Sequence, residues 1–130
     1  MANRSLVVSL VSGVALMLSL VCRTALAHHS FAMFDMQKTL TVAGTVKDYQ
    51  WTNPHVWIDL VVTDATTHQQ SVYSVECGST AILARMGWTR ESLKPGEQVA
   101  VVVNPLKHGT GGSLVSASLN GTRIGHDIKF

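Results

Sequence analysis

Five segments of this chain alternate apolar with polar residues, which is the pattern of half-buried β-strands. In the first segment Leu40, Val42 and Val46 face one way while threonines and Lys47 face the other. Gly44 interrupts this alternation, and a glycine inside a long strand predicts a bulge or a sharp bend. The predicted strands are residues 38–50, 55–63, 71–77, 98–103 and 113–119.

One short helix is predicted between the third and fourth strands. Ser79 or Thr80 can cap its start, residues 81–86 are mostly good helix formers, and Gly87 stands where a left-handed residue ends a helix. Three strands, one helix and two strands is the order of the five-stranded oligonucleotide/oligosaccharide-binding (OB) barrel. The chain is therefore predicted to be all-β with one short helix, folded as a small OB-like barrel. The alternative, an immunoglobulin-like sandwich, requires about seven strands and no helix in mid-chain.

The first 27 residues have the features of a secretion signal. Arg4 precedes an apolar run over residues 5–21, and Ala25-Leu26-Ala27 is a small-x-small cleavage pattern. The run is slightly short for a membrane-spanning helix, which needs about 20 residues. The sequence thus predicts a cleaved signal peptide, residues 1–27, and one OB-like domain, residues 28–130. The processed protein is expected to be periplasmic or secreted, and not embedded in a membrane.

Cleavage changes both the charge and the cysteine content. It removes two of the ten Lys and Arg residues and none of the eight Asp and Glu residues, which leaves eight of each. A neutral domain lacks the basic surface that releases counterions from nucleic acid, so no nucleic-acid partner is expected. Of the two cysteines only Cys77 remains, so an internal disulfide is excluded and Cys77 is predicted to be a buried, small apolar residue.

Four histidines suggest a metal site. In an OB barrel the loops after the first and fourth strands lie on one binding face. Here those loops contain His55 and His108, while cleavage places His28 and His29 at a new N-terminus. Imidazole and amine nitrogens suit Cu(II), Ni(II) or Zn(II), and a terminal histidine offers both groups.

The sequence predicts His28, His29, His55 and His108 as metal ligands, with copper as the leading metal. Trp51 and Asn53, in the first of these loops, are expected to support the ligands or to contact a partner. Two other readings stay open. A histidine in a turn is also explained by exposure to solvent, and the same face without metal would make a protein- or glycan-interaction module or an accessory subunit.

No motif indicates an enzyme. The carboxylates are scattered, the segment ECGST is not a GxSxG nucleophile elbow, and the glycines at 109–112 precede a strand and not the helix that phosphate binding favours. The predicted function is that of an exported, nonenzymatic binding module.

Several blocks together resemble a bacterial family of small exported proteins, the domain of unknown function numbered 6152. These blocks read HHSFAMFD, GTVKDYQWTNPHVWI, LARMGW, SLKPGEQV, NPLKHGTGGSLVS and NGTRIG. The resemblance implies a secreted small β-barrel with no established activity. It places His28, His29 and His55 inside recognisable blocks, implies a variable position for His108, and makes Cys77 a peculiarity of this chain.

The processed protein is expected to begin at His28. Intact mass spectrometry of material exported by a bacterial host should give the mass of residues 28–130. A different first residue would remove the terminal histidine from the metal hypothesis.

Overall fold

A computed structural model describes residues 29–126. The chain divides into two compact units, residues 1–33 and residues 34–130. In the first unit the described element is the single-turn helix α2 (His29–Ala32). The predicted signal peptide lies outside the described residues. The second unit holds every described strand.

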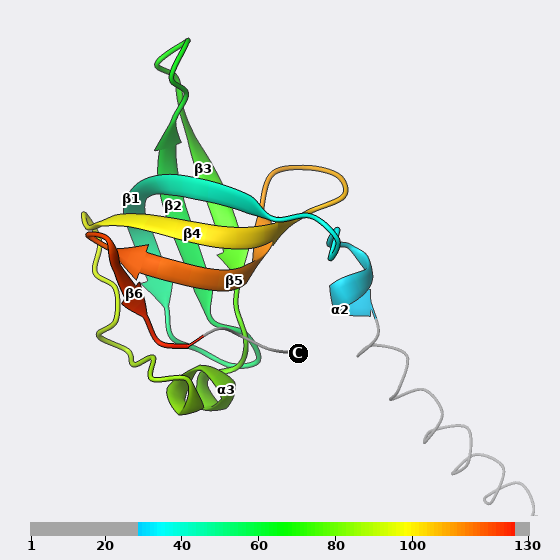
Figure 1. The fold of residues 1–130 in the computed structure, drawn as a ribbon, viewed down its shortest axis with the longest axis vertical. Coiled ribbons are helices and arrows are strands. Elements are labelled where there is room, and N and C mark those ends of the chain that lie inside the picture. Colours follow the sequence, from blue (N-terminus) through cyan, green and yellow to red (C-terminus); the bar gives the residue numbers. More distant parts are fainter. Residues whose placement is uncertain (1–28, 127–130) are drawn as a thin grey trace, which may run out of the picture. The chain divides into compact units, whose positions relative to one another are not determined.

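The second unit is a closed, mostly antiparallel barrel (Figure 1). The strand order is β3-β2-β1-β4-β5-β6, and a parallel pairing between β3 and β5 closes the sheet. This is the predicted all-β OB-like barrel with one short helix. The elements are β1 (Leu40–Gln50), β2 (Trp57–Thr63), β3 (Gln70–Glu76), α3 (Thr80–Arg85), β4 (Gln98–Pro105), β5 (Gly112–Leu119) and β6 (Thr122–Ile124).

The short strand β6 is an addition to the five predicted strands. Asn120 and Gly121 have φ values of 50° and 80°, the left-handed conformation that a tight hairpin turn requires. The turn returns the chain along β5, so that Thr122 pairs with Leu119 and Ile124 with Ala117. Residues 122–124 therefore extend the sheet.

The core is formed by the inward-facing residues of the alternating segments. Burying these aliphatic side chains removes most of their surface from water, which is the main stabilising contribution available to a domain without an internal disulfide. The largest fully buried side chains are Ile58, Leu60, Leu83, Leu114, Val46, Val56, Val75, Val101 and Val103.

Gly44 permits a close approach of two strands. A Cβ atom at this position would lie 2.7 Å from the carbonyl oxygen of Val61. The register shift of β1 lies further along the strand, between Val46 and Asp48. The predicted bulge therefore belongs to Lys47, and Gly44 is explained by strand spacing.

The single helix of the barrel unit forms where the sequence predicts it. The Ser79 hydroxyl accepts a hydrogen bond from the backbone N–H of Ile82 at 3.3 Å, which caps α3. Leu83 is fully buried, and Gly87 has a φ of 85° just after the helix ends. In Figure 1 α3 lies at the end of the barrel opposite the tip of the β2–β3 hairpin.

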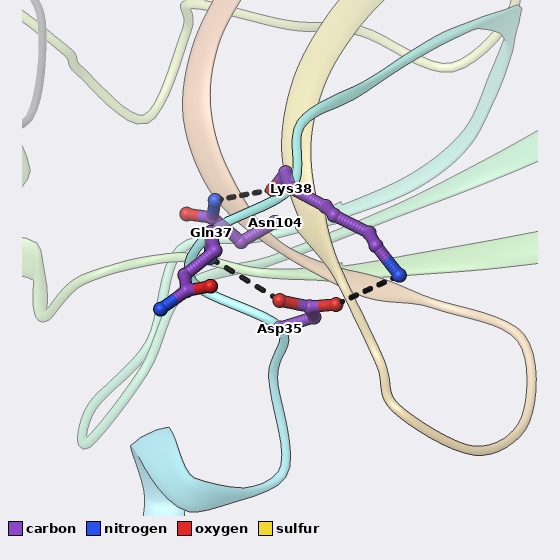
Figure 2. Close-up of polar contacts among 4 residues, drawn as sticks. All are labelled: Asp35, Gln37, Lys38 and Asn104. Carbon is purple, nitrogen blue, oxygen red and sulfur yellow. Dashed lines mark hydrogen bonds and ion pairs between the residues drawn. The ribbon is translucent and has the colours of Figure 1, made fainter.

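The segment before β1 is fastened to the end of β4 (Figure 2). Buried Asn104 donates from Nδ2 to the carbonyl oxygen of Lys38 at 2.7 Å. Asp35 also donates from its backbone N–H to the carbonyl oxygen of Pro105 at 2.8 Å. The Lys38 ammonium lies 3.2 Å from Asp35 and lowers the pKa of that carboxyl. Phe34 is buried, whereas Met36 is 45% exposed.

Replacing Gly44 with alanine should destabilise the barrel by about 1–3 kcal/mol, because the new methyl group meets the Val61 backbone and the strands must separate. Urea denaturation measures the change. Ala43→Ser, at the exposed neighbouring position, should change the free energy of unfolding by less than about 0.5 kcal/mol. Equal stability of Gly44→Ala and the parent protein would contradict this account.

Candidate ligand-binding face

The outer surface of β1, β2 and β3 is the best candidate for a binding face. Ile58, Leu60 and Val75 point into the core, so their neighbours along each strand point outward. Trp57 pairs with Glu76 and Asp59 pairs with Ser74, which places these four side chains in two adjacent rows. The next row pairs Val61 with Val72.

His55 and Glu76 form a close polar contact on this face. The Nδ1 atom of His55 lies 2.7 Å from Oε1 of Glu76. The Glu76 side chain is 13% exposed and that of His55 is 38% exposed. This carboxylate fixes the orientation of the ring. Among residues 29–126, no hydrogen-bond partner contacts the second ring nitrogen, Nε2.

Further carboxylates lie along the same surface. Ser74 donates from Oγ to Oδ1 of Asp59 at 2.6 Å. Asp48 pairs with Asp59 across β1 and β2, and Gln50 donates to Oδ2 of Asp48 at 2.9 Å. Together with Glu76, these residues give the face an acidic character.

The loop between β1 and β2 is fastened to the start of α3. Oδ1 of Asn53 accepts from the backbone N–H of Thr80 at 3.2 Å and from its hydroxyl at 3.0 Å. Val56 donates to Gly78 at 3.0 Å, and Cys77 donates back to Val56 at 2.8 Å. These contacts hold the backbone on both sides of His55, and they give Asn53 a structural role.

Trp51 lies beside Tyr49 at this end of the barrel. Their ring centroids are 6.1 Å apart and the rings are tilted by 58°. Tyr49 donates from its hydroxyl to the carbonyl oxygen of Thr89 at 3.0 Å, and burial raises the pKa of this phenol. Trp51 therefore belongs to an aromatic pair that packs against the core.

Only part of the predicted histidine set can be placed. His28 lies outside the described residues, and the side chain of His29 is not described. His108 is exposed in the loop between β4 and β5, which closes through a hydrogen bond of 2.9 Å from Leu106 to Gly111. Within residues 29–126, no group of three or more His, Cys, Asp or Glu side chains is arranged to hold a metal ion.

The two predicted binding loops leave β1 and β4 at different places. Leu40 pairs with Val103, so the loop that contains His108 starts beside the beginning of β1, whereas the loop that contains His55 follows its end. The loop that contains His108 ends at the start of β5. There β5 pairs with β3, so that Ser113 lies opposite Glu76. This end of the loop lies beside the partner of His55.

Cys77 is a core residue, as predicted. It is 6% exposed, and burial raises the pKa of its thiol well above the usual value, with a further contribution from the Glu76 carboxylate. A protonated, buried thiol is a poor metal ligand.

Neither Glu76 nor Trp57 is among the site residues that the sequence predicts. The alternation in WIDL and in SVYSVE does assign both residues to the outer surface. The missing information was the β2–β3 register, because a slip of one residue would reverse the face of every side chain.

Comparison with known proteins agrees with the fold. The chain is a small OB-like β-barrel with a polar outer face. It belongs to the family described as "Family of unknown function (DUF6152)", whose model matches residues 16–115. No curated protein matches the chain.

Solved structures with the same fold include two crystal structures of Rim1, a mitochondrial single-stranded DNA binding protein from S. cerevisiae. The first is 9% identical, with a TM-score of 0.51, and the match covers 65% of this chain and 95% of that chain. The second, with selenomethionine, is 10% identical with the same TM-score of 0.51, and covers 64% of this chain and 93% of that one. At these identities the likeness concerns the fold alone.

In the part of the chain that the structure describes, no helix has the length and apolar character needed to cross a bilayer.

The Asn53 side chain is expected to stabilise the loop through its contact with α3. Asn53→Ala removes the acceptor for Thr80 and should cost about 0.5–1.5 kcal/mol, the usual net contribution of a hydrogen bond. Asn53→Asp keeps the acceptor and should retain most of the stability. Thermal unfolding followed by circular dichroism compares the two variants, and equal melting temperatures would exclude this role.

Proposed function

We propose that the chain is an exported, nonenzymatic binding module that binds a transition-metal ion, with copper as the leading choice. The observation that carries this proposal is the contact between His55 and Glu76. A metal-binding histidine commonly donates its other ring N–H to a carboxylate, which fixes the ring and increases its basicity. Nδ1 of His55 contacts Oε1 of Glu76, and in this proposal Nε2 is the nitrogen that binds the metal.

The remaining ligands in this proposal come from the processed N-terminus. His28 would supply an amine and an imidazole nitrogen, and these two groups form a chelate for Cu(II). His29 or His108 would supply a further imidazole.

The acidic face supports a cationic ligand. Asp48, Asp59 and Glu76 create a negative potential that attracts cations and repels phosphate groups. Single-stranded DNA is therefore not the proposed ligand of this face. Nucleic-acid affinity requires Lys or Arg side chains that neutralise phosphates.

A metal-independent interaction module is the second candidate, and Trp57 favours it. Trp57 is half-buried on the outer face, directly opposite Glu76 and one row from Asp59. An aromatic surface flanked by carboxylates suits a basic segment of a protein or a glycan. Trp51 and Asn53 lie at the edge of the same loop.

Copper titration of the processed protein separates these candidates. The protein that begins at His28 should bind Cu(II) with a visible absorption band, and an extra leading methionine should weaken binding by at least about tenfold because the amine is displaced. His55→Ala should also weaken binding, and Glu76→Gln should cost about 10–100-fold, as expected for loss of an orienting carboxylate.

His68→Asn is the matched control for these variants. His68 lies in the exposed β2–β3 turn with a φ of 57°, a conformation that asparagine adopts readily. Its replacement should leave copper affinity unchanged. If all of these proteins bind copper equally, the metal proposal is wrong and the interaction module remains.

A further inference from the structure

The turn between β5 and β6 consists of an asparagine followed by a glycine. Leu119 pairs with Thr122, so Asn120 and Gly121 form a two-residue hairpin turn, and their φ values are 50° and 80°. Both residues are exposed. A Cβ atom placed on Gly121 would meet no atom of the described chain, residues 29–126, within 4 Å. The side-chain amide and the backbone nitrogen that follows it are therefore not shielded by other parts of the barrel.

The sequence makes Asn120 chemically different from the other asparagines. Asparagine is thermolabile, because its side-chain amide can react with the backbone nitrogen of the next residue. This reaction needs a nitrogen that carries a hydrogen and is not hindered by a side chain. In residues 28–130, Asn53 and Asn104 are each followed by proline, whose nitrogen carries no hydrogen. Asn120 is the remaining asparagine of this range, and the glycine after it has no Cβ atom.

We propose that Asn120 is a site of spontaneous deamidation, which converts it into aspartate and isoaspartate. The Gly121 nitrogen attacks Cγ of the Asn120 amide and forms an N–Cγ bond. The Cγ–NH₂ bond breaks, and the amide leaves as ammonia with the proton of the Gly121 N–H. Water then opens the resulting succinimide ring at either of its two carbonyl groups. The net change replaces one NH by O, and because the reacting groups belong to adjacent residues the reaction needs no enzyme.

The short strand β6 makes this reaction possible in the folded protein. Closure of the ring requires the Asn120 backbone to leave its left-handed turn conformation, so the hairpin must open briefly. Strand β6 has three residues, of which Thr122 and Arg123 are exposed. Within residues 29–126 it pairs with β5 alone, and it lies at the edge of the sheet (Figure 1). A short edge strand with few buried side chains opens at a low free-energy cost.

Isoaspartate would disrupt the pairing of β6. In isoaspartate the chain continues through the side-chain carbonyl, which adds one methylene to the backbone of the turn. A two-residue turn has a fixed geometry that matches the twist of its strands, and the longer backbone does not fit it. The pairs that Ala117 forms with Ile124 and Ser118 forms with Arg123 would then lose their register.

The end of β6 also holds the segment after α3. His126 donates its backbone N–H to the carbonyl oxygen of Met86 at 3.1 Å. A Cβ atom on Gly125 would lie 2.7 Å from the indole ring of Trp88 and would also contact the Met86 carbonyl oxygen. This close packing requires β6 to deliver Gly125 to its present position. A change in the exposed turn is therefore transmitted to the end of the barrel where α3 lies.

Mass spectrometry of the processed protein tests the modification. Folded protein kept in mildly alkaline buffer should gain the mass difference between O and NH, and fragmentation should locate the change at residue 120. Asn120→Gly keeps a Gly-Gly hairpin turn and removes the amide, so it should show no gain. His68→Asn is the matched control for exposure, because it places an asparagine in the other exposed hairpin turn before Gln69. This variant should gain mass at residue 120 and not at residue 68.

The structural effect is separated from the new charge by comparing the two products. Asn120→Asp has the carboxylate on a normal backbone, and Asp-Gly also suits this turn, so its melting temperature should equal that of the parent. The isoaspartate form, isolated by ion exchange, should melt at a lower temperature. Its Ile124 N–H should also exchange with solvent faster, because pairing with Ala117 protects this group in the parent.

Two results would overturn the proposal. One is a folded parent protein that gains no mass, and a sample in urea would then show whether the turn protects Asn120. The other is an equal gain by Asn120→Gly, because the reaction would then lie at another residue. Neither measurement uses metal, so the outcome is independent of the copper titration.

Discussion

The closed barrel depends on the short parallel pairing between β3 and β5. It joins Val75 to Gly112 and Glu76 to Ser113, and it converts an open sheet into a barrel. At the same residue β5 approaches β4 closely, because a Cβ atom on Gly112 would lie 2.8 Å from both the carbonyl oxygen of Asn104 and a methyl group of Val103. The same pairing holds the strand that carries Glu76, so the orientation of the His55 ring depends on closure of the barrel.

The polar contacts of the barrel unit fasten its loops and ends, while its interior is mostly aliphatic, with Trp88 also buried. Asn104 joins the segment before β1 to β4, and Asn53 joins the β1–β2 loop to α3. Each side-chain amide bonds to main-chain groups that would otherwise need water. Charged side chains on the outer face do not weaken the core, because successive residues of a strand point alternately outward and into the core. A binding surface can therefore vary on this fold while the barrel is kept.

The fold was largely predictable from local signals, and the candidate site only in part. Alternation located the five long strands, and Ser79 with Gly87 located the helix. Strand pairing is not a local property, so the sequence did not reveal that Glu76 contacts His55 or that β6 pairs with β5. The alternation pattern marked Gly44 as an unusual strand residue. The reason for a glycine at this position is the carbonyl oxygen of Val61 on the neighbouring strand, which lies near Gly44 only in the folded chain.

The buried thiol of Cys77 gives the barrel an internal reporter of its own opening. Disulfide exchange and alkylation need an accessible thiolate. In the folded core the Cys77 thiol is buried, and burial raises its pKa so that it stays protonated. In an oxidising environment the intact barrel is thus protected from cross-linking through this residue, whereas a partly unfolded chain is not. The rate at which a thiol reagent labels Cys77 consequently measures how often the core around it opens.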